Sequence, residues 1–356
     1  MATYKSIKYL VPVEAVEHTD SINALNDVDT VTAAPTDGQT IKWNGTNWVP
    51  SDITEEEASG TQKALFGFGS PSGVTNVSNL VSSSGVVATD TTGVGTARTG
   101  IAAAGYGDDK AIFGFGKNDN GETNVTNLVS NAGVVASDTT GVGTSRGFLA
   151  AAGYGGDKAI FGFGNTASNN RKNMTNLVSS SGVVATDTTG VGTSRSNLAA
   201  AGYGSDKAIF GFGEIGDPYN MTNLVSNTGV VATDTNGVGT ARQRLPGSGY
   251  GGDKAIFGFG GSDYSSTTNV TNLVSNTGVV ASDSTGVGTA RWGSAAAGYG
   301  GDKAIFGFGN FVNYGYDSYA INTVNLISNL GVVASDTTGV GTARHRLAAA
   351  GYSTTA

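Results

Sequence analysis

Residues able to perform acid–base or nucleophilic chemistry are scarce in this chain. It contains two histidines, His18 and His345, and no cysteine. Without cysteine, neither a disulfide framework nor a thiolate metal site can form. A Ser-His-Asp triad would have to use His345, yet no nucleophile-elbow sequence is present. His345 falls at a variable position, which favours a solvated loop side chain. We therefore expect no catalytic residue and no enzyme activity.

Two short motifs carry fragments of other chemistry. Asp27-x-Asp29 and the run from Asn118 to Glu122 contain part of a calcium loop, but neither has the full series of ligands. Both are typical of surface turns, so we expect no metal and no cofactor. The run Ser137-Asp138-Thr-Thr-Gly is similar to the Ser-x-Asp-x-Gly-x-Thr-Trp turn of sialidases, although its spacing differs and the tryptophan is missing.

Paired charges recur six times along the chain. An aspartate stands eight residues before an arginine in each case: Asp90 and Arg98, Asp138 and Arg146, Asp187 and Arg195, Asp234 and Arg242, Asp283 and Arg291, Asp336 and Arg344. A sixfold copy is unlike a single active site, and buried charges persist when they are paired and hydrogen-bonded. We expect these residues to form structural ion pairs, within one repeat or between neighbouring repeats.

The composition excludes several classes of protein. Glycine supplies 56 of 356 residues and charged residues only 13%, unlike an ordinary helical or α/β enzyme. Residues 1–62 hold ten of the 28 acidic and three of the 20 basic side chains, which leaves a nearly neutral body and argues against nucleic-acid binding. No apolar run approaches the ~18 residues of a membrane span, and no secretory signal is evident. We expect a soluble protein without membrane insertion.

Internal repeats indicate the architecture that positions these residues. The motif Lys-Ala-Ile/Leu-Phe-Gly-Phe-Gly begins at Lys63, Lys110, Lys158, Lys207, Lys254 and Lys303. Within one unit, four β-type runs are separated by glycine-rich or Asn/Ser turns, at 151–154, 158–163, 173–179 and 182–187. In the second run, the period-two alternation predicts that Phe161 and Phe163 share one face and that Gly162 and Gly164 share the other. Aromatic rings of one sheet would then fill the space beside the glycines of the next, as between propeller blades.

The ends of the repeat region predict closure into a ring. The first unit lacks the Ala-Ala-Ala-Gly-Tyr run, and residues 347–352 supply that run after the last unit. We expect an all-β, six-bladed β-propeller closed by the C-terminal strand; a trimeric β-fibre is the rival. The expected domains are an N-terminal segment 1–50, an acidic linker 51–62 and a propeller 63–356. Its expected blades are 63–98 plus 347–352, 99–146, 147–195, 196–242, 243–291 and 292–344.

Two resemblances accompany these patterns. The repeated order of Arg, a strand of small residues, Asp-Lys-Ala-Ile-Phe-Gly-Phe-Gly, a variable loop, Asn-Leu-Val-Ser-Asn and Gly-Val-Val-Ala resembles kelch repeats over residues 63–352. Residues 25–50, with Gly38-Gln39, Trp43-Asn44-Gly45 and Trp48, resemble a short module near the start of bacteriophage tail-fibre and other virion appendage proteins. That resemblance implies a virion attachment segment with Trp43 and Trp48 buried against a neighbouring chain. Asn44-Gly45 alone predicts a hairpin turn, in which both tryptophans could instead be core residues of a self-packed hairpin.

Differences among the repeats fall in two places. One is the connection after the second strand: 70–75, 117–123, 165–172, 214–219, 261–268 and 310–321. The other is the pair of residues after each arginine: 99–100, 147–148, 196–197, 243–244, 292–293 and 345–346. In an antiparallel meander both segments emerge on one face, so this face is either a recognition surface on a rigid scaffold or a region of drift. The candidate ligand-binding residues are the exposed aromatic and polar side chains of its later loops: Tyr219, Tyr264, Trp292, Phe311, Tyr314, Tyr316, Asp317 and Tyr319.

The resemblance to appendage proteins implies an exposed tail-fibre or appendage protein of a bacteriophage virion, made in the host cytoplasm. Its N-terminal segment would bind other virion proteins, and its variable face a host surface receptor such as a glycan. One alternative is a decoration, collar or capsid-fibre protein whose loops bind other virion proteins; another is a glycan-degrading propeller enzyme. A homotrimer would favour a fibre position, and a monomer would favour decoration of a lattice.

Overall fold

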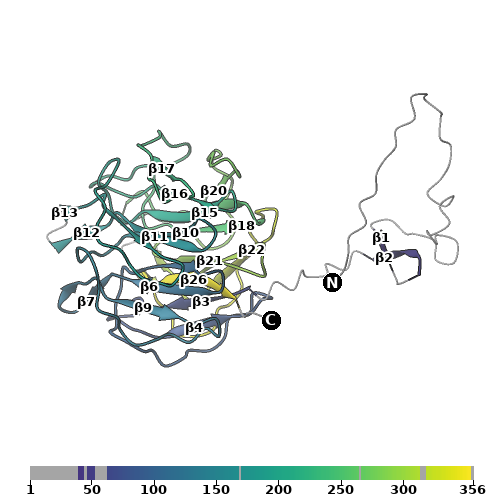
Figure 1. The fold of residues 1–356 in the computed structure, drawn as a ribbon, viewed down its shortest axis with the longest axis horizontal. Helices are drawn as coiled ribbons and strands as arrows, with labels where there is room; N and C mark the ends of the chain where they lie inside the picture. Colours follow the sequence, from purple (N-terminus) through teal and green to yellow (C-terminus); the bar gives the residue numbers. More distant parts are fainter. Residues whose placement is uncertain are drawn as a thin grey trace. The chain divides into compact units, whose positions relative to one another are not determined.

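A computed structural model describes residues 39–43, 46–52, 62–167, 170–263, 266–312 and 318–353. The chain divides into two compact units, Met1–Glu57 and Ala58–Ala356. All the strands and sheets of the described residues are antiparallel in pairing, and no α-helix occurs among them (Figure 1). The expectation of an all-β protein is confirmed.

The described residues of the first unit form a hairpin. Strand β1 (Gln39–Trp43) pairs antiparallel with β2 (Trp48–Asp52), and the register sets Trp43 opposite Trp48. The connection therefore spans four residues, rather than a two-residue turn at Asn44-Gly45, both of which lie outside the described residues. Because β2 runs to Asp52 and β3 of the second unit begins at Gln62, the expected linker 51–62 is too long at both ends.

In the second unit, the described residues form six three-stranded sheets, each with an inner, a middle and an outer strand. The inner strands are β26 (Ala348–Ser353), β5 (Ala102–Tyr106), β10 (Ala150–Tyr154), β15 (Ala199–Tyr203), β18 (Gly247–Tyr250) and β21 (Ala295–Tyr299). The middle strands are β3 (Gln62–Gly67), β6 (Lys110–Gly114), β11 (Lys158–Gly162), β16 (Lys207–Gly211), β19 (Lys254–Gly258) and β22 (Lys303–Gly307). The outer strands are β4 (Ser78–Val81), β9 (Thr126–Val129), β14 (Thr175–Val178), β17 (Thr222–Val225), β20 (Thr271–Val274) and β25 (Val324–Ile327). Three short hairpins extend the connections after the middle strands: β7 (Lys117–Asn118) with β8 (Gly121–Glu122), β12 (Asn165–Thr166) with β13 (Asn170–Arg171), and β23 (Asn310–Val312) with β24 (Ser318–Ala320).

The prediction of a fourth regular strand in each repeat is wrong. In the third repeat the segment 182–187 meets β14 only through the isolated bridges of Val184 with Val178 and of Thr188 with Thr175. Between these bridges the buried Asn176 donates its side-chain amide to the carbonyl of Ala185, at 3.0 Å. The carbonyl of Ala185 thus accepts a hydrogen bond from a side chain, which interrupts the regular ladder of backbone hydrogen bonds between this segment and β14.

The predicted alternation in the middle strand is also wrong at its end. Phe163 has a φ of +64°, so the two rings of the Phe-Gly-Phe motif point to opposite faces of the sheet. Phe161 lies 5.2 Å from Phe115 of the preceding sheet, and Phe163 lies 5.1 Å from Phe210 of the following sheet, between ring centroids. Each sheet therefore presents one aromatic ring to each neighbour.

Glycines in the middle strands admit these rings. A β-carbon on Gly162 would lie 2.6 Å from Cζ of Phe210, and one on Gly114 would lie 2.8 Å from Cζ of Phe161. These distances are shorter than any real contact between such carbon atoms, so the ring of one sheet occupies the space of the absent side chain. The expected packing of aromatic rings beside the glycines of the neighbouring sheet is confirmed at these positions.

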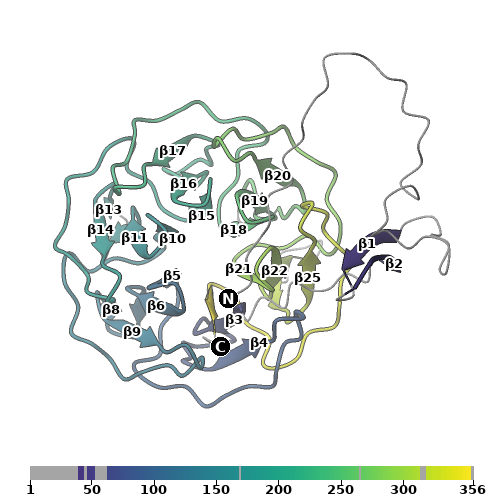
Figure 2. The same ribbon diagram turned by 45° about the vertical axis from the view of Figure 1, so that its right-hand side comes forward.

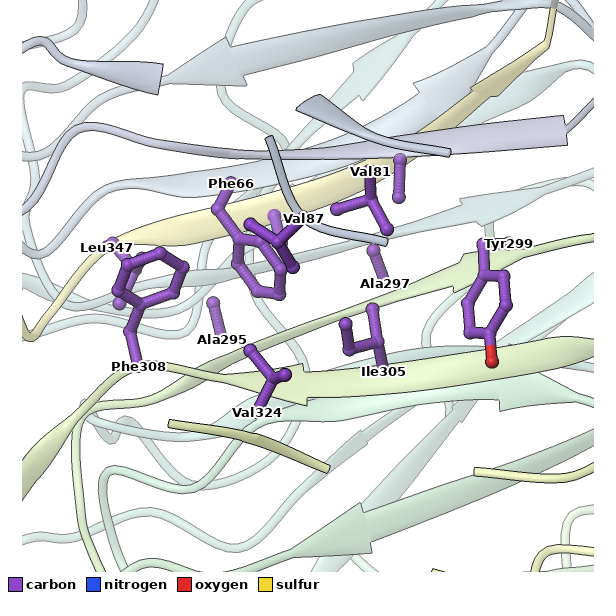
Figure 3. Packing of buried hydrophobic residues seen from close by; sticks show 12 residues of the cluster. Phe66, Val81, Val87, Ala295, Ala297, Tyr299, Ile305, Phe308, Val324 and Leu347 are labelled. Carbon is purple, nitrogen blue, oxygen red and sulfur yellow. The ribbon is translucent and has the colours of Figure 1, made fainter. Parts of the chain in front are cut away.

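The two ends of the repeat region meet in one sheet. β26 pairs antiparallel with β3, with Ala348 opposite Gly67 and Tyr352 opposite Lys63, as predicted for the C-terminal run. Each inner strand contacts the next in the order β26, β5, β10, β15, β18 and β21, and β21 contacts β26. Figure 2 shows the sheets arranged around a common centre. Figure 3 shows the buried cluster in which Phe66 and Val87 of the first repeat pack with Ile305 of the last.

Candidate functional site

The two variable segments of each repeat lie side by side. The residue after each arginine forms an isolated antiparallel bridge with the start of a connection after a middle strand: Thr99 with Lys117, Gly147 with Asn165, Ser196 with Glu214, Gln243 with Gly261, Trp292 with Asn310 and His345 with Ser70. Because Ala150 at the start of β10 lies opposite Gly162 at the end of β11, both segments are at the same end of the sheet. We call this end the variable surface.

Six residues of the variable surface form a closed ring of backbone hydrogen bonds. They are the second residues after the six arginines: Gly100, Phe148, Asn197, Arg244, Gly293 and Arg346. Each backbone N–H donates to the carbonyl of the preceding member, at 2.7–2.9 Å, and the N–H of Gly100 closes the circle on Arg346. We call these residues the axial ring.

All six members of the axial ring have left-handed backbone conformations, with φ between 54° and 64°. Glycine adopts this conformation without a steric cost, whereas other residues are strained by ~1–3 kcal/mol each. Gly100 and Gly293 show that the ring needs no side chain at these positions. The side chains of Phe148, Arg244 and Arg346 are therefore kept in spite of a conformational cost.

A cavity of about 120 Å³ lies at the axial ring. Its lining includes Phe148, Asn197, Arg244, Arg346 and Ser294, together with the small residues that begin the inner strands. We call it the mouth cavity. It holds side chains from several repeats, so its chemistry differs from that of any single repeat.

One side of the mouth cavity is basic and aromatic. The guanidinium carbons of Arg244 and Arg346 lie 4.9 and 5.4 Å from the ring centre of Trp292. The ring of His345 meets the same indole edge to face, at 5.2 Å between centroids. Burial, followed by the charges of Arg346 and Arg244, lowers the pKa of His345 to about 4. The expectation of a solvated loop histidine is therefore wrong, and His345 is neutral at pH 7.

Several buried polar atoms on this side have no hydrogen-bond partner among the described residues. They are Nε1 of Trp292, Oγ of Ser294, Nδ1 of His345 and Oε1 of Gln243. Most buried polar groups in folded proteins are hydrogen-bonded to protein or water. Trp292 Nε1 and Ser294 Oγ can donate hydrogen bonds, whereas Gln243 Oε1 can only accept them. Donors beside two guanidinium groups are suited to an oxygen-rich, negatively charged ligand.

A carboxylate next to the axial ring forms a salt bridge within the protein. Glu214 forms an ion pair with Arg171 at 2.5 Å and accepts a hydrogen bond from Ser196 Oγ at 2.5 Å. Asn197 of the axial ring also donates to it, at 3.3 Å. Burial alone would raise the pKa of Glu214. The hydrogen bonds and the charge of Arg171 together outweigh burial, so the pKa lies below its ordinary value and Glu214 is ionised within its salt bridge.

The aromatic residues predicted for the binding surface fall into three groups. Tyr219 and Tyr319 are 38% and 49% exposed, and the ring of Tyr319 packs on Phe311 across the β23–β24 hairpin, at 5.5 Å. The prediction of an exposed ring is wrong for Trp292, which is only 7% exposed because the arginines and His345 surround it. The remaining predicted residues lie outside the described residues: Tyr264, Tyr314, Tyr316 and Asp317.

The repeated aspartates and arginines pair between neighbouring repeats. Arg146 lies 3.2 Å from Asp187 of the next repeat, whereas Asp138, eight residues before it, lies 3.8 Å from Arg98. Arg195 likewise lies 3.7 Å from Asp234, while Arg242 interacts electrostatically with Asp283. The circle closes with Arg344 and Asp90, at 3.9 Å.

Each of these aspartates is also held by hydrogen bonds across the same interface. Asp187 accepts from the backbone N–H and the hydroxyl of Thr144, at 2.9 and 2.6 Å, and from the amide of Asn176, at 2.9 Å. Burial alone would raise the pKa of Asp187. The hydrogen bonds and the charge of Arg146 outweigh burial, so the pKa of Asp187 lies below its ordinary value. The pairs therefore join neighbouring repeats.

A second cavity, of about 300 Å³, lies at the opposite end of the inner strands. Tyr154, Tyr203, Lys207 and Lys254 line it, all from the nearly invariant turns between inner and middle strands. These lysines bond the aspartate that precedes them, as Lys207 does with Asp206 at 3.1 Å. Its composition repeats from sheet to sheet, unlike that of the mouth cavity.

Sequence reasoning missed Phe148, Asn197, Arg244 and Arg346 as site residues, although it marked the variable pairs that contain them. Their position in the repeat could have identified them, because each is the second residue after an arginine that all six repeats share, just before an inner strand.

No protein-family model matches the chain, and no curated protein matches it. Within the described ranges, no group of three or more His, Cys, Asp or Glu side chains is placed to hold a metal ion. The same residues include no helix long and apolar enough to cross a bilayer.

Proposed function

We propose that this chain is an exposed virion protein of a bacteriophage, a tail-fibre or appendage component, that binds a host surface receptor through the variable surface. In this proposal the six sheets are the blades of a kelch-like β-propeller, and the receptor is a surface glycan. The N-terminal segment attaches the protein to other virion proteins.

The sheet contacts support the propeller architecture. Each inner strand contacts those of two neighbouring sheets, and the last repeat packs on the first through the cluster of Phe66, Val87 and Ile305. The pairing of β26 with β3 joins the two ends of the repeat region within one sheet. A propeller of this kind has no exposed terminal repeat, which an open solenoid would have to cap.

The distribution of variation carries the proposal of receptor binding. Six nearly identical repeats differ mainly in segments that the bridges bring together at one end, while the turns at the other end barely change. Rigid scaffolds with variable loops are typical of recognition surfaces. The variable surface also exposes the rings of Tyr219 and Tyr319, which are suited to stacking on a sugar.

The virion assignment rests on the resemblance of residues 25–50 to appendage proteins. The hairpin of β1 and β2 lies in this segment, and Trp48 is 38% exposed. Its ring thus offers apolar surface to a neighbouring chain.

The test is binding of the purified full-length protein to intact cells of candidate host strains. One variant carries Ser-Gly replacements in loops 261–268 and 310–321, and the matched control carries them in loop 70–75, which lies on the same surface and has no aromatic residue. We expect the first variant to lose binding and the control to retain it. Failure of the folded wild type to bind any strain would contradict receptor binding and favour a structural decoration protein.

A further inference from the structure

We propose that the mouth cavity binds the carboxylate of an acidic sugar, with Arg244 and Arg346 as its cationic ligands. This inference deepens the proposed function and rests on it for the source of the ligand, a glycan of the host surface. The juxtaposition of two arginines, one indole and several buried donors at the axis carries the assignment.

The first argument is the concentration of positive charge. Arg244 and Arg346 approach one indole ring to 4.9 and 5.4 Å, although they come from different repeats. Only 6% of Arg244 is exposed. Guanidinium groups form charge-assisted hydrogen bonds with a carboxylate, and these are stronger than hydrogen bonds between neutral groups.

The second argument is that the fold does not require these two side chains. Gly100 and Gly293 fill the equivalent positions with the same left-handed backbone and the same hydrogen bonds. Arginine at such a φ is strained, and strain of this kind is found where a side chain serves a function. Structural stability alone would favour glycine throughout the axial ring.

The third argument concerns the remaining polar atoms. Trp292 Nε1, Ser294 Oγ and His345 Nδ1 are buried without a hydrogen-bond partner among the described residues. Ser294 lines the mouth cavity directly. A carboxylate bound by the arginines would bring oxygen acceptors to the part of the cavity that Ser294 lines.

The size of the cavity is compatible with this ligand. Its volume of about 120 Å³ is several times the ~10–15 Å³ that one water molecule requires, which leaves room for a carboxylate group. The rest of the sugar would lie outside the cavity, on the variable surface, where Phe148 is half-buried at the rim.

The test uses the full-length protein and four probes: glucuronic acid, glucose, inorganic phosphate and sodium chloride at matched ionic strength. Binding is measured by calorimetric titration and by tryptophan fluorescence, since Trp292 is the one tryptophan of the repeats. The variants are Arg244→Gly and Arg346→Gly, which place in the ring the residue that two repeats already have. Lys207→Gln, at the opposite end of the inner strands, is the control that removes the same charge.

We expect the wild type and Lys207→Gln to bind glucuronic acid and not glucose. Either arginine variant should weaken this binding at least tenfold while retaining a cooperative thermal transition, because one charge-assisted hydrogen bond contributes about that factor. Absence of glucuronic acid binding by the wild type, or unchanged binding by both arginine variants, would overturn the proposal. Phosphate binding as tight as that of glucuronic acid would overturn the assignment to an acidic sugar.

Cell binding separates this proposal from the broader one. If the wild type binds host cells and both arginine variants bind equally well, receptor binding stands and the carboxylate site fails. If the wild type binds no host strain, the proposed function fails whatever the titrations show.

Discussion

Replacement of Arg195 by alanine should destabilise the second unit without a specific effect on ligand binding. The Arg195 side chain is fully buried and stacks on Phe163, with its guanidinium carbon 4.4 Å from the ring centre. It donates to Asn223 Oδ1 at 2.7 Å and to the carbonyl of Phe212 at 2.8 Å, and lies 3.7 Å from Asp234.

The magnitude follows from the groups left behind. Alanine orphans two buried acceptors, on Asn223 and Phe212, at about 1–3 kcal/mol each. Asp234 is 28% exposed as a side chain and keeps its bonds from Thr193 and Asn223, so it adds less than a fully buried orphan charge would. We expect the free energy of unfolding to fall by about 4 kcal/mol, or the melting temperature by about 8 °C.

Urea and thermal unfolding of the full-length protein measure this change, with Lys207→Ala as a control for an exposed basic residue. Arg195→Met keeps much of the packing on Phe163 but none of the donors, so it should recover only part of the loss. A destabilisation below about 1 kcal/mol, or loss of cell binding by a variant as stable as the wild type, would refute the structural role of the pair.

Three further predictions concern packing, pH and closure. Gly162→Ala should destabilise by about 1–3 kcal/mol in urea unfolding, because its new β-carbon would lie 2.6 Å from Phe210, whereas Gly73→Ala, with no atom within 4 Å, should not. His345 has a pKa of about 4 when folded and 6.5 when unfolded, so stability should fall as pH drops from 6.5 towards 4, by up to about 3 kcal/mol; His345→Gln should flatten this part of the pH profile, and an unchanged slope would contradict the assignment. Deletion of 347–356 should uncover the core beside β3 and broaden thermal unfolding followed by circular dichroism, and an unchanged melt would count against closure.

Much of the fold could be predicted because its signals are local and repeated. Alternation and glycine-rich turns placed 151–154 and 158–163 within one residue of β10 and β11. The missing run of the first repeat predicted the partner of β3. The left-handed backbone at Phe163 could not be predicted, because phenylalanine disfavours it and only the rings of two neighbouring sheets impose it.

The site was predictable in place but not in composition. Differences among the repeats identified the residue pairs after the arginines as part of the site. The expectation that aromatic residues at a sugar site are exposed was wrong for Trp292, which is buried. In the sequence, Arg244 and Arg346 lie 102 positions apart and look like drift. Only the closed circle of backbone hydrogen bonds brings them to one axis.

The joining of the two ends of the repeat region in one sheet also sets the order in which this unit can fold. Five of the six interfaces between sheets join repeats that are adjacent in sequence, so they can form as the chain leaves the ribosome. The sixth joins partners as distant as Asn79 and Arg344, which are 265 residues apart. Until the last strand is synthesised, one edge of β3 has no partner and could pair with other extended chains. Pairing of β26 with β3 therefore ends this exposure, and chains interrupted before β26 should be the species that aggregate.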